Sequence, residues 1–229
     1  MRSILTCIAV VTLSTVPAIA ADPAHPTVIE LFQSQGCSSC PPAIANVNAL
    51  AGRPDVLALI FAVTYWDQLG WRDTFAKPAF TARQWDYAHA GGRAQVATPQ
   101  TIVNGRVVTN GGNQAQLEQA IRQGDRGTTG PAIETAGGRV TIATGHTATP
   151  ATVWLVRYDP RTLAVPIRAG ENGGRTLAHR NVVRSLERLG GWTGARAAFT
   201  VPAPKIPNTR AAVLVQKGKG GPIIAAARL

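Results

Sequence analysis

The sequence has few acidic residues, only three cysteines, and no long apolar run beyond its first 20 residues. Twelve Asp and Glu residues stand against 23 Lys and Arg residues, so the formal net charge is +11. The chain nevertheless lacks a basic helix, zinc-finger spacing and an aromatic ribonucleoprotein motif, so we predict no nucleic-acid binding. Because no later stretch reaches the ~20 apolar residues of a spanning helix, we also expect no stable membrane insertion after signal cleavage.

The first residues have the three parts of a secretory signal peptide. Arg2 is positive, residues 4–16 are mostly apolar, and a small-x-small triplet ends at Ala20. A membrane anchor is the alternative, but Pro17 ends the apolar run well short of a spanning helix. We therefore predict a signal peptide over residues 1–20 and a periplasmic or secreted mature protein.

Cysteine is confined to two places in the chain. Cys7 lies in the predicted signal peptide, so Cys37 and Cys40 would be the two cysteines of the mature protein. Such a CxxC pair can close on itself in an oxidising compartment. A structural zinc site would need a second pair, and the four histidines are scattered. We predict no resident metal or other cofactor, with Cu(I) binding by two thiolates and a histidine as an alternative.

Residues 21–126 show the element order of an α/β thioredoxin-like domain. Alternating short apolar runs, Pro-Pro at a helix start and an Asn-Gly hairpin signal support this order. The expected elements are a strand at 27–32, a helix at 41–50, a strand at 56–63, a helix at 78–90 within an insertion over 65–97, hairpin strands at 100–103 and 106–109, and a helix at 113–123.

Residues 127–229 change to short alternating runs separated by turns. This texture predicts a smaller, mainly antiparallel β domain, sandwich-like in packing. Strands are expected at 139–144, 152–158, 162–168, 196–201 and 211–216, whereas 176–189 is compatible with a strand, a helix or both.

The cysteine motif lies between a predicted strand and a predicted helix. A helix N-terminus favours a thiolate, so Cys37 is the candidate nucleophile, with an accessible sulfur, and Cys40 is the resolving thiol. A structural disulfide is the alternative interpretation. Thr98-Pro99 precedes the third strand and resembles the cis-proline that faces the cysteine pair in thioredoxins. We therefore predict a cis bond there that lets the Thr98 backbone pair with an extended substrate, with an ordinary trans turn proline as the alternative.

Four further residues leave the second strand beside the cysteines. Tyr65, Trp66 and Trp71 either form a wall for substrate or pack the inserted helix on the sheet. Asp67 is a candidate for adjusting the pKa of the thiol. Glu30, in an otherwise apolar strand, either assists proton transfer to the resolving thiol or points to solvent.

Four blocks of sequence resemble a bacterial exported family that is catalogued only as a domain of unknown function. The blocks are Glu-Leu-Phe-x-Ser-Gln-Gly-Cys-Ser-Ser-Cys-Pro-Pro (30–42), Tyr-Trp-Asp-x-Leu-Gly-Trp-x-Asp-x-Phe (65–75), Thr-Pro-Gln-x-Ile-Val-Asn-Gly (98–105) and Gly-Glu-Asn-x-Gly (170–174). The resemblance implies a thioredoxin-like fold and a functional cysteine pair. We interpret the last block as a Gly-rich turn, with binding of an acidic ligand or a partner surface as the alternative.

Together these features predict an exported thiol–disulfide oxidoreductase-like protein. Its partners would be protein or small-molecule thiols and disulfides. Two alternatives remain open: a non-catalytic thioredoxin-like binding module with a structural disulfide, and a Cu(I)-handling protein.

Overall fold

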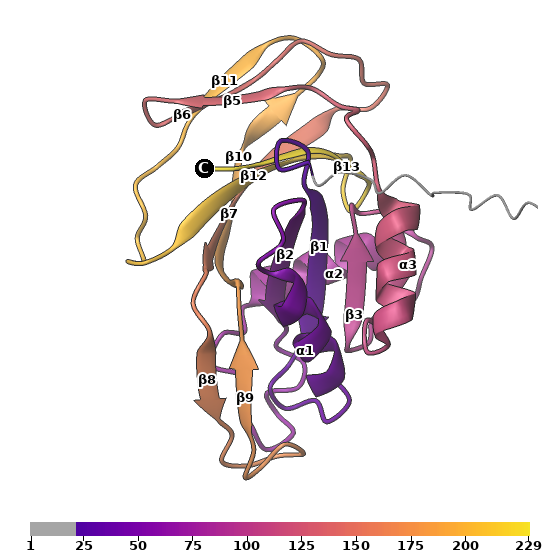
Figure 1. Ribbon diagram of the computed structural model, residues 1–229, viewed down its shortest axis with the longest axis vertical. Coiled ribbons are helices and arrows are strands. Elements are labelled where there is room, and N and C mark those ends of the chain that lie inside the picture. Colours follow the sequence, from indigo (N-terminus) through magenta and orange to yellow (C-terminus); the bar gives the residue numbers. More distant parts are fainter. Residues whose placement is uncertain (1–21) are drawn as a thin grey trace, which may run out of the picture.

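The computed structural model describes residues 22–229, so the predicted signal peptide lies outside the described residues. This part of the chain is a mixed α/β fold with one large sheet, two small sheets and three helices (Figure 1). None of these helices combines the length and the apolar character needed to cross a membrane.

The elements alternate between helix and strand up to residue 124 and are all strands beyond it. The helices are α1 (Pro41–Leu50), α2 (Pro78–Ala90) and α3 (Gln114–Gly124). The strands are β1 (Thr27–Gln33), β2 (Val56–Ala62), β3 (Gln100–Val103), β4 (Val107–Thr109), β5 (Ile133–Ala136), β6 (Arg139–Ile142), β7 (Ala151–Asp159), β8 (Leu163–Pro166), β9 (Thr176–His179), β10 (Val182–Trp192), β11 (Ala197–Thr200), β12 (Arg210–Lys217) and β13 (Ile223–Arg228).

The centre of the large sheet is the predicted βαβ unit. β1 and β2 run parallel and are joined through α1, as expected for two apolar strands with a helical crossover. β3 pairs antiparallel with β1, with Gln100 opposite Phe32. The beginning of β3 therefore lies beside the end of β1. The hairpin of β3 and β4 turns at Asn104-Gly105, both with positive φ, which confirms the predicted turn.

The large sheet continues across the predicted domain boundary at residue 127. Its spatial order is β13-β12-β7-β10-β2-β1-β3-β4, so strands from both halves of the chain share it. The junction is at β2 and β10, where the Ile60 amide donates to the Asn181 carbonyl and the Asn181 side chain donates to Ala58. The sequence pattern identified β2 but left the stretch that holds β10 open and did not predict this pairing, because periodicity reports which face is buried and not which strand lies alongside.

Most predicted strands of the C-terminal half are present, and the ambiguous stretch contains the strands β9 and β10. The sheet β11-β6-β5 covers one face of β7, β12 and β13, with Ile142, Val153 and Trp192 in the core between them. This layering resembles a sandwich, but one of its two layers is the continuous sheet. The sequence analysis did not predict β5 and β13.

Two further cores lie on the two faces of β1, because side chains of a strand alternate between faces. Ile29 and Leu31 pack in a cluster with residues of α1 and α3. Val28 and Phe32 pack in a second cluster, toward α2. β1 is buried at every position.

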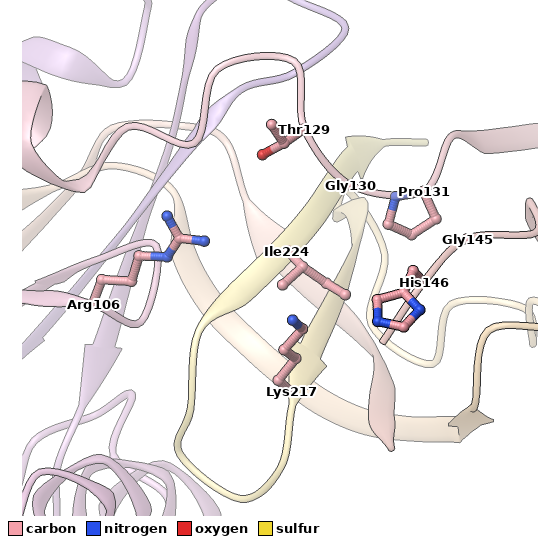
Figure 2. A pocket seen from close by; sticks show the side chains of 8 residues that line it. All are labelled: Arg106, Thr129, Gly130, Pro131, Gly145, His146, Lys217 and Ile224. Atoms are coloured by element: carbon pink, nitrogen blue, oxygen red, sulfur yellow. The ribbon is translucent and has the colours of Figure 1, made fainter. Parts of the chain in front are cut away.

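A cavity of about 270 Å³ opens where the turn between β3 and β4 meets the β12–β13 hairpin (Figure 2). It lies away from the cysteine pair in the fold, since none of its lining residues belongs to β1 or α1.

Candidate functional site

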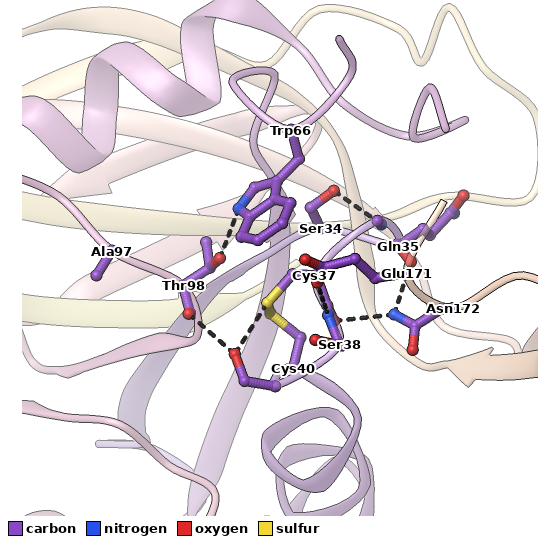
Figure 3. The surroundings of a disulfide bond; sticks show 12 residues. Ser34, Gln35, Cys37, Ser38, Cys40, Trp66, Ala97, Thr98, Glu171 and Asn172 are labelled. Atoms are coloured by element: carbon purple, nitrogen blue, oxygen red, sulfur yellow. Dashed lines mark hydrogen bonds between the residues drawn. A yellow bond between two sulfur atoms is a disulfide. The ribbon is translucent and has the colours of Figure 1, made fainter. Parts of the chain in front are cut away.

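A disulfide joins Cys37 and Cys40 between the end of β1 and the start of α1, with the two Cα atoms 5.5 Å apart (Figure 3). The Cys40 amide donates to the Cys37 carbonyl, and Cys40 is the N-cap of α1. Pro41 and Pro42 follow at the first helical positions, where a missing N–H removes no helical hydrogen bond. The sequence-based placement of the pair is confirmed.

The sulfur of Cys37 is not accessible, which corrects the sequence-based expectation. Cys37 and Cys40 both have 0% relative exposure. Their neighbours Ser38 and Ser39 are exposed, and Ser39 Oγ lies 3.3 Å from Cys37 Sγ and 3.4 Å from the Thr98 carbonyl oxygen. The sulfurs therefore lie beneath a thin cover of exposed polar residues. Sequence pattern located the pair at a helix start. It did not predict the burial of the sulfurs, to which segments distant in sequence contribute, such as Thr98.

Part of this cover is the loop 170–174 between β8 and β9. The Ser38 amide donates to the Glu171 carboxylate at 2.9 Å, and hydrogen bonding from the Ser38 side chain together with this amide holds the pKa of Glu171 below its usual range. The buried Asn172 amide donates to the carbonyls of Gln35 and Cys37, at 2.9 Å each. Figure 3 shows both residues on one side of the cysteine turn.

Sequence reasoning favoured a turn for this Gly-Glu-Asn-x-Gly block over a surface for an acidic ligand or a partner, so Glu171 and Asn172 were missed as residues of the cysteine site. The available signal was the block itself, which is polar, distinctive and part of the family resemblance. Its position more than 130 residues from the cysteines gave no indication of contact.

Thr98 and Pro99 lie on the other side of the disulfide. Their peptide bond is cis, as predicted. The Trp66 indole N–H donates to Thr98 Oγ1 at 2.8 Å, and the Ser39 hydroxyl donates to the Thr98 carbonyl. Trp66, which follows β2, and Thr98, which precedes β3, therefore meet beside the cysteine pair at one edge of the sheet. The antiparallel pairing of β1 and β3 places the start of β3 at this edge.

The segment after β2 fixes the turn that leads into the cysteines. The Trp71 indole N–H donates to Gln35 Oε1 at 2.9 Å, and the Gln35 amide donates to the Asp73 carboxylate at 2.7 Å. Asp73 is buried, and burial raises its pKa to about 6. The sequence analysis did not single out Asp73, whose role depends on a turn 38 residues away.

Tyr65 and Asp67 have other partners than the cysteines. The Tyr65 hydroxyl donates to Gln84 of α2 at 3.2 Å, and Asp67 accepts the Asp73 amide at 3.1 Å. Of the four predicted residues, Trp66 and Trp71 contact residues that border the disulfide, while Tyr65 and Asp67 hold the insertion in place. No hydrogen bond in the described residues links Asp67 to a cysteine.

The position of Glu30 corrects the sequence-based interpretation that it assists proton transfer to the resolving thiol. Its position in β1 places it on the same face as Val28 and Phe32, whereas the cysteines pack on the opposite face. Its carboxylate is fully buried and accepts hydrogen bonds from Arg83 at 2.6 and 3.1 Å and from the Tyr87 hydroxyl. Because the sheet separates Glu30 from the sulfurs, a proton relay between them is not supported.

Within residues 22–229 there is no group of three or more His, Cys, Asp or Glu side chains placed to hold a metal ion. The cysteine site supplies two sulfurs, and its neighbouring polar groups are hydroxyls, amides and the Glu171 carboxylate.

Residues 28–216 match the model of a family described as "Protein of unknown function (DUF1223)", and the chain belongs to that family. A crystal structure of a structural-genomics target protein from Agrobacterium tumefaciens is similar to this chain, with 31% identity and a TM-score of 0.74 over 91% of this chain and 96% of that one. HBP35 of Porphyromonas gingivalis shares the fold at 14% identity, with a TM-score of 0.60 over 90% of this chain and 75% of that one. None of the curated proteins compared with it matches the chain.

Proposed function

We propose that this protein is an exported thiol–disulfide oxidoreductase whose thioredoxin-like unit extends from β1 to α3 and whose reactive group is the Cys37–Cys40 pair. The main support for the proposal is that four separate sequence blocks meet around the disulfide. The cysteine block, the Trp66–Trp71 block, Thr98-Pro99 and the Glu171-Asn172 block all meet at one sheet edge. A structural disulfide with a two-residue spacer contributes only about 2 kcal/mol and needs no such surroundings.

In the exchange, a substrate thiolate attacks Cys37 Sγ, the Cys37–Cys40 bond breaks, and Cys40 leaves as a thiolate. A second substrate thiolate then attacks the substrate sulfur of the mixed disulfide. This step forms the substrate disulfide, releases Cys37 as a thiolate and leaves two electrons on the cysteine pair. The same steps in reverse reduce a substrate disulfide. In either direction, the Thr98 backbone is proposed to dock an extended substrate beside the sulfurs.

Because both sulfurs are buried, the exchange requires the loop 170–174 to move first. Three hydrogen bonds hold it, two from Asn172 and one to Glu171. The two from the buried Asn172 amide contribute about 1 kcal/mol net each, so opening costs a few kcal/mol and is within reach of ordinary conformational exchange. The proposed site is therefore closed at rest and opens to react.

Complete burial of Cys37 favours one second candidate, a binding module in which the disulfide is structural. Trapping separates the two. Cys40→Ser and Cys37→Ser are incubated with oxidised glutathione, and adducts are followed by mass spectrometry while circular dichroism verifies folding. We expect a glutathione adduct on Cys37 in Cys40→Ser, at least about tenfold faster than on Cys40 in Cys37→Ser.

Absence of an adduct on the folded Cys40→Ser variant, or equal rates in the two variants, would contradict the redox proposal. The double variant Cys37→Ser/Cys40→Ser serves as the control for stability. If the disulfide is structural, the free energy of unfolding of the double variant should fall by about 2 kcal/mol, and neither single variant should contain a reactive thiol.

A further inference from the structure

The cavity between the β3–β4 turn and the β12–β13 hairpin has walls set by backbone contacts. Gly130 has φ +111°, and a Cβ there would lie 1.9 Å from the Ile224 carbonyl oxygen. Only glycine therefore allows the segment 129–131 to approach β13 this closely. Ile224, which is 8% exposed, lies between the basic side chains of the cavity (Figure 2). The backbone part of the cavity wall is therefore fixed, whereas the basic side chains that line the cavity are exposed or half-buried.

Three basic side chains reach this cavity from different parts of the chain. Arg106 comes from the β3–β4 turn, His146 from the segment before β7, and Lys217 from the end of β12. In Figure 2 Arg106 and His146 lie on opposite sides of Ile224, and Lys217 lies on a third side. Neither Asp nor Glu is among the residues that line the cavity.

The charges of these residues are not neutralised within the described part of the chain. No salt bridge within residues 22–229 involves Arg106, His146 or Lys217. Lys219, two residues beyond Lys217, does pair with Asp86 at 3.1 Å. Acidic partners are thus present for a neighbouring cation of the same hairpin but absent from the cavity.

A fourth cation, the buried Arg126, lies near Arg106 outside the cavity lining. Burial lowers the pKa of Arg126 from the ordinary value, an effect that Asp125 and Asp22 oppose and the charge of Arg106 strengthens. Arg106 is therefore close enough to Arg126 for their charges to repel each other. An anion bound beside Arg106 would relieve that repulsion.

From these observations we propose that the cavity binds a small organic anion with two or more carboxylate groups. Two separated cations and an imidazole suit more than one negative group, and the Arg106 guanidinium suits a carboxylate in particular. Ile224 and Pro131 give apolar contact for a short carbon frame. The volume of about 270 Å³ is near the lower end of small-molecule sites, which limits the ligand to a few carbon atoms beyond its carboxylates.

Isothermal titration of the full chain at fixed ionic strength tests this site, with citrate, succinate, acetate and inorganic phosphate as probes. We expect citrate and succinate to bind and acetate to bind at least about tenfold more weakly, since one charge-assisted hydrogen bond contributes that much affinity. Phosphate binding as tight as citrate binding would overturn the ligand class. Absence of any carboxylate binding would overturn the site.

A matched pair of variants separates the cavity from the overall positive charge. Lys217→Gln removes a cation that lines the cavity, and Lys219→Gln removes one from the same hairpin outside it. We expect citrate affinity to fall at least about tenfold in Lys217→Gln and less than twofold in Lys219→Gln. Equal losses in the two variants would show attraction to net charge only and contradict the proposal. Neither variant touches the disulfide, so this test is independent of the redox proposal.

Discussion

The two faces of β1 lie against two buried groups of different kinds, an ion pair on one face and a disulfide on the other. On the face toward α2, the Glu30 carboxylate is neutralised by Arg83 and accepts the Tyr87 hydroxyl, all on rigid elements of the core. On the face toward α1, the disulfide lies among hydroxyl and amide groups, and the loop 170–174, which carries the Glu171 carboxylate, binds the backbone of the cysteine turn. An ion pair of opposite charges is suited to permanent burial, whereas a hydrogen-bonded loop leaves the cysteines a way to become exposed.

The largest expected effect belongs to the ion pair. Arg83→Met leaves the Glu30 charge buried without its partner, and we expect the free energy of unfolding to fall by about 3–5 kcal/mol in urea titrations. Glu30→Gln/Arg83→Met removes both charges and should recover part of this loss. The rate at which dithiothreitol reduces the disulfide in the folded fraction should stay unchanged. A single variant that loses less than about 1 kcal/mol would show that the pair is not structural.

A smaller, pH-dependent effect is expected for Asp73, which supports the turn before the cysteines. Burial raises its pKa to about 6, above the ~3.9 of an unfolded chain, so the folded state favours the protonated form. The stabilising contribution is full below the unfolded pKa and is lost as the pH rises through about 6.

Asp73→Asn keeps the shape of the side chain without the charge. Its stability relative to wild type should therefore rise by up to about 3 kcal/mol between pH 4 and pH 7. Urea titrations of both proteins across this range give the difference, in which the other titrating groups cancel. A difference that does not vary with pH would mean that Asp73 titrates normally in the fold.

The smallest expected change in stability concerns the loop over the disulfide. Asn172→Ala removes two hydrogen bonds and should cost about 1–2 kcal/mol, while the dithiothreitol reduction rate of the disulfide should rise about tenfold. Glu171→Gln should raise the rate by less, since its side chain still carries an acceptor oxygen. Glu134→Gln, an exposed acid paired with Arg196, is the matched control and should change neither quantity. Unchanged reduction in Asn172→Ala would show that the loop does not restrict access.

The sequence by itself determined the local elements of this protein. The apolar runs of β1 and β2, the Pro-Pro start of α1 and the Asn-Gly hairpin depend on residues within a few positions of each other, and the structure confirms them. The same holds for the position of the cysteine pair and for the cis bond at Thr98-Pro99. These features could be predicted because their physical causes are local.

Tertiary structure alone decided what surrounds those elements. It joined β10 to β2, so that one sheet spans both halves of the chain, and it placed Glu30 opposite Arg83 and away from the sulfurs. It also brought Asn172 onto the Cys37 carbonyl, and it buried the Cys37 sulfur, which the sequence predicts to be accessible. Contacts between residues so far apart depend on the packing of whole elements, and hydrophobic periodicity within one element does not specify its partners.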